Sequence, residues 1–301
     1  MLNQPSDETV IITAASQSFG NAILALIGSL NLNWPLHPRV IDYNLGLTPD
    51  VLQKLSESGI EVRKVPPFVP HWRKHFIWKL YCLHDIQAKN VIWMDAGLCI
   101  LQPLDEIFTW LDKVGYFFLV NYELLDYEAS EEACKACGVP VEFRFGKHTL
   151  PSGLMGFRKD EMIASILEEA FLIAHNEDAM KASQPTHRHD QAIISLLFYK
   201  YFGQPLFSDG LIYLGWEKPD SVPGQKVWVH RRLMRKEDTD HFIRFINEPG
   251  EPYLPKAKEV ITVKEPLISR ILSGPKKMLK SILIKLKLWQ EPVKKKRFMM
   301  V

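Results

Sequence analysis

An acidic residue stands directly after a short apolar run in the first third of the chain. Asp95 is the last residue of the segment Val91–Asp95, whose other four residues are apolar, and it is followed by Ala96 and Gly97. A carboxylate that leaves a buried strand at its end is well placed to hold a divalent cation against a diphosphate. Aspartate also caps the turns that follow strands. The spacing alone leaves both interpretations open.

A second carboxylate stands where a helix is expected to begin. The apolar residues Ile193 and Ile194 put Asp190 in the first turn of that helix, on its inward face. There a carboxylate is well placed to orient a hydroxyl group or to take its proton. The alternative is an acidic residue that only interacts with the helix dipole.

A loop rich in small residues separates the first expected strand from the first expected helix. Its sequence, Thr13–Gly20, would let a nucleotide approach the backbone and a helix N-terminus. It contains neither a Gly-x-Gly-x-x-Gly fingerprint nor a Walker loop, and a tight turn explains its composition almost equally well. The residues around the expected nucleoside position are Thr13, Ala14, Ala15, Ser16 and Asp42.

These candidates need a scaffold, and the hydrophobic pattern indicates one. Apolar and β-branched runs predict strands at 10–13, 40–43, 61–65 and 91–95, with helices at 23–30, 48–59 and 76–86. Alternating strands and helices predict an α/β fold with a mainly parallel central sheet flanked by helices. Ligands of such sheets bind outside the carboxyl ends of the strands, where Thr13 and Asp95 are expected.

The second half of the chain is less regular. Further strands are predicted at 116–120, 211–214 and 227–230, with helices at 159–174 and 189–201. Residues 127–150 mix charge, glycine and proline, and we interpret them as a long excursion outside the core. Residues 248–264 are rich in proline and lysine, which is typical of a linker. The expected organisation is a domain at 1–247, this linker, and a tail at 265–301.

Length and composition favour one large globular domain or two small ones. The chain has 301 residues, of which 47% are hydrophobic, enough for a buried core. Four cysteines do not make a disulfide framework. Residues 1–8 lack the features of a secretory signal, and no stretch of about 18 apolar residues predicts a membrane-spanning helix. The expected compartment is therefore the reducing cytoplasm.

Positive charge is concentrated at the C-terminus. Residues 274–301 contain nine Lys or Arg and one acidic residue, although the net charge of the whole chain is only +2. The rest of the chain is mildly acidic, and this charge is not typical of a nucleic-acid-binding domain. Apolar residues recur at helical spacing from Ile268 to Leu286, which predicts an amphipathic helical tail on an anionic membrane surface. The alternative is a helix that packs on its own domain or on a partner.

The order of the short motifs resembles a known family across roughly residues 10 to 232. It is similar to that of GT-A-type glycosyltransferases, the nucleotide-diphosphosugar transferases of family 8, to which glycogenin and galactosyltransferases belong. The motifs that carry the resemblance are Ile12–Ala15, Phe76–Leu80, Val91–Ile100, Pro103–Leu104, Pro151–Arg158, His189–Gln191 and Trp228–His230.

The resemblance implies roles for individual residues. It implies a UDP-sugar donor, with Asp190 and Gln191 as the catalytic pair. The implied donor-binding residues are Lys79, Asp95, Ala96, Gly97, Ser152 and Gly153, in addition to those around the nucleoside. Asp95 and His230 are implied as ligands of Mn²⁺ or Mg²⁺, with the diphosphate and water completing the shell. His230 on its own is more typical of a surface or core histidine.

One departure from the family affects the expected function. The family's metal motif is Asp-x-Asp, and here Gly97 stands where the second carboxylate belongs. The first hypothesis is a hexosyltransferase in polysaccharide biosynthesis, which transfers sugar to a glycan or lipid-linked acceptor as a peripheral protein of the cytoplasmic membrane face. The second is a non-catalytic, membrane-tethered module that binds a sugar nucleotide or a glycan.

Overall fold

The computed structural model describes residues 8–208, 213–215, 224–230 and 236–247. These residues belong to one compact unit that lies within residues 1–255. The predicted linker at 248–264 and the predicted amphipathic tail at 265–301 lie outside the described residues.

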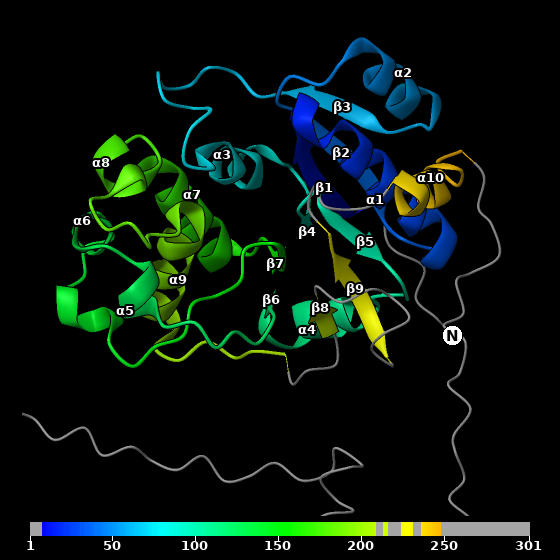
Figure 1. The fold of residues 1–301 in the computed structure, drawn as a ribbon. Coiled ribbons are helices and arrows are strands. Elements are labelled where there is room, and N and C mark those ends of the chain that lie inside the picture. Colours follow the sequence, from blue (N-terminus) through cyan, green and yellow to red (C-terminus); the bar gives the residue numbers. More distant parts are fainter. Residues whose placement is uncertain (1–7, 209–212, 216–223, 231–235, 248–301) are drawn as a thin grey trace, which may run out of the picture. The chain divides into compact units, whose positions relative to one another are not determined.

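A six-stranded sheet forms the centre of the unit (Figure 1). Its strands, in spatial order, are β3 (Glu61–Lys64), β2 (Arg39–Asn44), β1 (Thr9–Ala15), β4 (Asn90–Met94), β7 (Leu154–Arg158) and β6 (Tyr116–Phe118). The first four strands pair in parallel, whereas β7 pairs antiparallel with both β4 and β6. The predicted mainly parallel sheet is confirmed.

Helices cover both faces of this sheet and bury its strands from two sides. Val10, Ile11 and Ile12 of β1 are all fully buried, as expected of a central parallel strand. On the face of Ile11 lie α1 (Gly20–Asn33), α2 (Pro49–Glu57) and α4 (Glu106–Val114). On the face of Ile12 lie α3 (Ile77–Asp85), α7 (Glu161–Ile173) and α9 (His189–Phe202).

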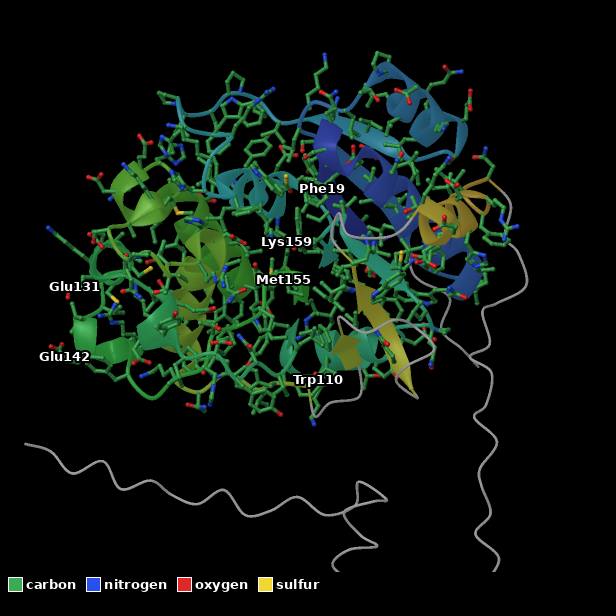
Figure 2. All side chains as sticks on the ribbon, viewed as in Figure 1. Phe19, Trp110, Glu131, Glu142, Met155 and Lys159 are labelled. Carbon is green, nitrogen blue, oxygen red and sulfur yellow. The ribbon has the colours of Figure 1, made fainter. Side chains whose placement is uncertain are left out.

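Part of the predicted excursion belongs to the core. It contains the end of the short helix α5 (Leu125–Glu128), the helix α6 (Glu131–Ala136) and the 3-10 helix η2 (Val141–Arg144), and α8 (Glu177–Lys181) packs on α6. Ala129, Cys134 and Cys137 are fully buried against the α3, α7 and α9 layer. The expectation that this stretch lies outside the core was wrong, because helices of four to six residues are too short to show a helical period. Figure 2 shows the contrast between Glu131, at the outer edge, and Met155 of β7, in the interior.

A second, three-stranded sheet lies beside the first. It has the order β5 (Leu98–Ile100), β9 (Gln225–Val229) and β8 (Tyr213–Gly215). The helix α10 (Lys236–Ile243) packs on α1 (Figure 1). Within the described ranges, no helix combines the length and apolar character that a membrane crossing requires.

Candidate functional site

Two of the motifs picked out in the sequence meet at one edge of the central sheet. Asp95 directly follows β4, and Ser152 and Gly153 directly precede β7. Because β7 runs antiparallel to β4, its start lies beside the end of β4. The backbone N–H of Asp95 donates a hydrogen bond to the carbonyl oxygen of Gly153 at 2.8 Å. This is also the edge at which the parallel strands β1 and β2 end.

Lys79 lies at the centre of the site. It comes from α3, and only 2% of the residue is exposed. Its Nζ donates to Oδ1 of Asp95 at 3.0 Å, to the carbonyl oxygen of Ser152 at 3.0 Å and to the Ser152 hydroxyl at 3.3 Å. Oδ2 of Asp190 lies 3.2 Å away on the other side. One ammonium group thus joins residues of four separate sequence motifs.

The charge of Lys79 is maintained by its two carboxylate neighbours. Burial acts to lower the pKa of Lys79, but Asp190 and Asp95 outweigh burial, so the pKa lies above its ordinary value. Burying a charged ammonium group costs roughly several kcal/mol in desolvation, so the charge persists only where nearby partners compensate for that cost. Asp95 and Asp190 are those partners of Lys79. Because its donors are already taken up, Lys79 holds the two carboxylates in place rather than pointing into solvent.

The Asp95 side chain is the accessible part of this cluster. It is 44% exposed, and its Oδ1 accepts from the Trp93 indole N–H at 2.8 Å as well as from Lys79. These bonds run to side chains and not to the backbone of the next turn, so the capping alternative does not describe Asp95. A Cβ atom on Gly153 would lie 3.4 Å from Oδ2 of Asp95. Glycine at this position therefore keeps the space beside that oxygen open.

The predicted catalytic pair opens α9 beside Lys79. Asp190 is 4% exposed, and its Oδ2 has no hydrogen-bond partner among the described residues, since its contact with Lys79 is an ion pair without hydrogen-bond geometry. Gln191 accepts from the backbone N–H of Ser152 through Oε1 at 3.3 Å. Its Nε2 donates to Glu128 at 2.7 Å. The side chains of Asp190 and Gln191 therefore both reach the Lys79 and Ser152 edge.

Glu128 is a polar residue of this site that sequence reasoning missed. It lies in α5, is 3% exposed, and also accepts from Nε of Arg188 at 3.2 Å. It is separated from Gln191 by 63 positions in the chain. No motif surrounds it, and the only available signal was an acidic residue within a stretch interpreted as an excursion.

Most of the residues predicted around the nucleoside are buried. Thr13 and Asp42 face each other across the β1 and β2 pair, and both are fully buried. Burial raises the pKa of Asp42 well above its usual range, and the Ala15 backbone N–H only partly opposes this. Ala14 and Ala15 are also buried. Ser16 is the first of these residues that is partly exposed, and its hydroxyl lies 3.2 Å from that of Ser18.

His230, one of the two predicted metal ligands, is hydrogen-bonded through its backbone to the segment that follows the other, Asp95. The N–H of His230 donates to the carbonyl oxygen of Gly97 at 3.1 Å, and both Ala96 and His230 are buried. Within the described ranges, no group of three or more His, Cys, Asp or Glu side chains is arranged to hold a metal ion. Oδ1 of Asp95 is already bonded to the Lys79 ammonium group. Asp95 therefore has Oδ2 left to face a cation, and a cation there would take most of its ligands from the diphosphate and water.

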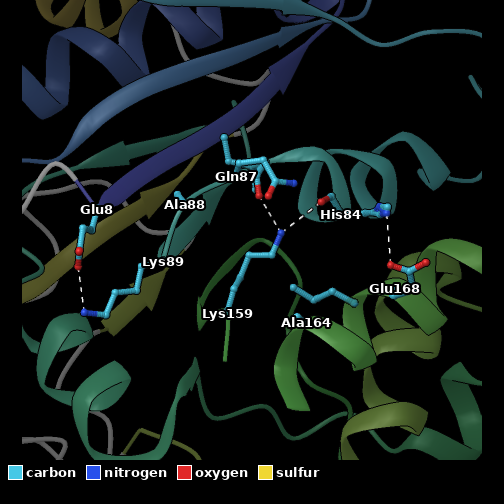
Figure 3. Close-up of a pocket in the computed structure, with 10 residues that line it drawn as sticks. Glu8, His84, Gln87, Ala88, Lys89, Lys159, Ala164 and Glu168 are labelled. Atoms are coloured by element: carbon cyan, nitrogen blue, oxygen red, sulfur yellow. Dashed lines mark hydrogen bonds and ion pairs between the residues drawn. The ribbon is translucent and has the colours of Figure 1, made fainter. Parts of the chain in front are cut away.

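A cavity of about 620 Å³ lies at the opposite edge of the sheet (Figure 3). Its lining includes Glu8, which precedes β1, and Lys89, which precedes β4, and these two form an ion pair at 2.9 Å. Nζ of Lys159 donates to three carbonyl oxygens at the end of α3 and the residue after it. The charged groups that line this cavity are bonded to one another and to the backbone. The edge of the sheet that holds Lys79 is therefore the better candidate for a functional site.

Comparisons with known proteins show distant likenesses only. No family model and no curated protein matches the chain. The chain is similar to the crystal structure of the galactosyltransferase LgtC in complex with donor and acceptor sugar analogues, with a TM-score of 0.47 and 12% identity over 82% of this chain and 98% of that one. A glutamine-to-glutamate active-site mutant of LgtC matches with a TM-score of 0.46 and 13% identity, over 78% and 94% of the two chains.

Proposed function

We propose that the protein is a glycosyltransferase that moves a hexose from a UDP-sugar to a glycan or lipid-linked acceptor. The observation that carries this proposal is the cluster of Asp95, Ser152 and Asp190 around Lys79. Residues of four separate motifs converge there, at the edge where open α/β sheets bind ligands.

The geometry supports a division of roles between the two carboxylates. Asp95 is the accessible one, so it is assigned to the donor side. Oδ2 of Asp190 is buried and, among the described residues, makes an ion pair with Lys79 but no hydrogen bond, so it can still accept one from the hydroxyl of an acceptor. In the transfer, the bond between sugar and diphosphate breaks, the acceptor oxygen bonds to the sugar, its proton goes to a base, and UDP leaves.

The leaving diphosphate needs positive charge as its bond to the sugar breaks. Lys79 already contacts two carboxylates, and the two arginines that follow His230 in the sequence, Arg231 and Arg232, lie outside the described residues. A divalent cation that arrives with the diphosphate would supply this charge. Calorimetric titration of UDP and UDP-hexoses with and without Mn²⁺ tests this expectation directly.

Two variants test the proposed roles. Asp95→Asn keeps the shape of the side chain and removes its charge, so transfer should be abolished while the fold stays intact. Asp190→Asn should lower turnover with less effect on donor affinity, because it is assigned to the acceptor. Asp112→Asn, an exposed acid in α4, is the matched control. Wild-type turnover in both site variants, or no binding of any UDP-sugar, would reject the proposal.

A second candidate function is a non-catalytic module that binds a sugar nucleotide or a glycan. It is favoured by Gly97 in place of a second metal-ligating carboxylate. Binding of UDP-sugars without hydrolysis or transfer, at any Mn²⁺ concentration, would support this alternative. We also propose that the basic tail attaches the protein to the cytoplasmic face of the membrane.

A further inference from the structure

Glu128 is a buried carboxylate that the proposed function does not yet use. Its Oε2 accepts from Nε2 of Gln191 at 2.7 Å, and its Oε1 accepts from Nε of Arg188 at 3.2 Å. Its backbone carbonyl accepts from the backbone N–H of Arg188 at 2.9 Å. Three bonds therefore tie this one residue of α5 to the start of α9.

The bond to Gln191 decides which way the Gln191 carboxamide points. The two ends of a carboxamide have nearly the same shape, and only their partners distinguish the donor end from the acceptor end. An ionised carboxylate accepts hydrogen bonds and donates none, so Glu128 selects the NH₂ end of Gln191. The oxygen end is thereby turned toward the backbone N–H of Ser152.

The orientation of this amide extends into the rest of the site. Ser152 also accepts two hydrogen bonds from Lys79, which in turn donates to Asp95. If the Gln191 amide turned over, its NH₂ group would face the Ser152 N–H, and two donors would oppose each other. Glu128 is thus the outer end of a polar chain that reaches the accessible carboxylate.

We propose that Glu128 is a positioning residue, which holds the oxygen of the Gln191 carboxamide toward the Ser152 backbone, beside Lys79 and Asp95. This inference rests on the proposed function, because it assigns Gln191 to the substrate side of that site. Glu128 itself does not touch substrate. The Ser152 backbone alone holds the Gln191 amide through a single 3.3 Å hydrogen bond. Glu128 adds a second partner, which disfavours the flipped orientation of the amide.

Glu128→Gln is the direct test, because it preserves the shape of the side chain and removes its charge. A glutamine at 128 presents either end to Gln191, so the orientation is no longer selected. We expect kcat to fall by roughly 10-fold to 100-fold, the size of effect that misplaced catalytic groups produce, with little change in the KM of the donor. Glu128→Asp, which keeps an acceptor-only group, should recover part of the loss. Glu123→Gln, an exposed acid that precedes α5, is the matched control.

A stability cycle tests the pairing without any substrate. Gln191→Glu places a second carboxylate beside Glu128, and two carboxylates so close share a proton, so the folded-state pKa of the pair rises. A raised folded pKa means that stability present at low pH is lost as pH increases. The Tm of Gln191→Glu should therefore fall increasingly below that of the wild type between about pH 4 and pH 7. The double variant Glu128→Gln with Gln191→Glu restores one carboxylate and one amide and should remove this pH dependence.

The outcomes separate the two proposals. An active wild type with unchanged kcat in Glu128→Gln rejects the positioning role alone. A Gln191→Glu variant whose Tm follows that of the wild type at every pH rejects the pairing on which the role depends. A wild type that binds no UDP-sugar and transfers none rejects the proposed function, and the positioning role with it.

Discussion

At the scale of single residues, Lys79 is the point on which the site depends. It is the one buried cation that both Asp95 and Asp190 contact among the described residues. Removing a single partner from a buried set of charges leaves the others uncompensated, which costs more than the set contributes as a whole. The Lys79 side chain therefore contributes both to the stability of the fold and to the geometry of the site.

Lys79→Met should destabilise the protein by about 3–5 kcal/mol at pH 7, because it leaves the buried Asp190 and the partly exposed Asp95 without their counterion. Denaturant unfolding at pH 7 measures the change. Lys74→Met, an exposed lysine of the preceding loop, is the control and should change stability little. Equal stability of Lys79→Met and wild type at pH 7 would contradict the central place given to this residue.

His187 is a second residue whose burial has a measurable consequence. Burial lowers the pKa of His187 to about 4, and the nearby His189 and His75 act in the same direction while Glu132 opposes them. A depressed histidine pKa gives stability that is fully present above about pH 6.5 and is lost as the pH falls toward 4. The full loss is about 3 kcal/mol. His187→Gln should flatten this part of the pH profile of the unfolding free energy, whereas the exposed His175→Gln should not.

At the scale of elements, a close approach between two helices depends on a glycine. A Cβ atom on Gly28 of α1 would overlap the carbonyl oxygen of Phe242 in α10. A glycine inside a helix costs about 1 kcal/mol relative to alanine, so its presence here indicates a packing requirement. Asn31 of the same helix strengthens the contact, because its side-chain NH₂ donates to the carbonyl oxygens of Phe245 and Ile246.

Gly28→Ala should therefore destabilise the protein, despite the higher helix propensity of alanine. We expect a loss of about 1–3 kcal/mol, because the overlap involves backbone and α10 must shift away from α1. Thermal unfolding measures the change. Asn21→Ala, at an exposed position of the same helix, is the control and should be neutral or slightly stabilising. A Gly28→Ala variant as stable as Asn21→Ala would contradict the packing described.

At the scale of the whole molecule, the basic tail is the feature that the described residues leave untested. The hypothesis from the sequence is that residues 274–301 form an amphipathic helix on an anionic membrane. Each basic residue near an anionic leaflet contributes on the order of 1 kcal/mol, which falls off within a Debye length. Membrane attachment would bring a lipid-linked acceptor to the proposed site.

The full chain should sediment with anionic liposomes at low salt and be partly released as salt rises. Deletion of residues 274–301 should abolish sedimentation and leave UDP-sugar binding intact, because the predicted linker separates the tail from the domain. Neutral liposomes serve as the control for charge. Aggregation of the truncated chain, or indifference of the full chain to anionic liposomes, would indicate that the segment belongs to the fold or to a protein interface.

The sequence by itself predicted β1, β2, β3, β4 and β6 of the central sheet and the residues at their ends, but not β7. Apolar runs of strand length identified β1, β2 and β4, and the polar residue after such a run placed Asp95 at a strand end, because burial and turns are encoded locally. Helical spacing likewise put Asp190 in the first turn of α9 on the inward side.

Only the tertiary structure decided which of these residues meet. The reversed direction of β7 brings Ser152 beside Asp95, and α3 inserts Lys79 between Asp95 and Asp190. Glu128 reaches Gln191 across 63 positions of the chain, through a helix too short to leave a periodic pattern. Such partners are set by strand direction and helix packing over long separations, and no local pattern of residue types records them.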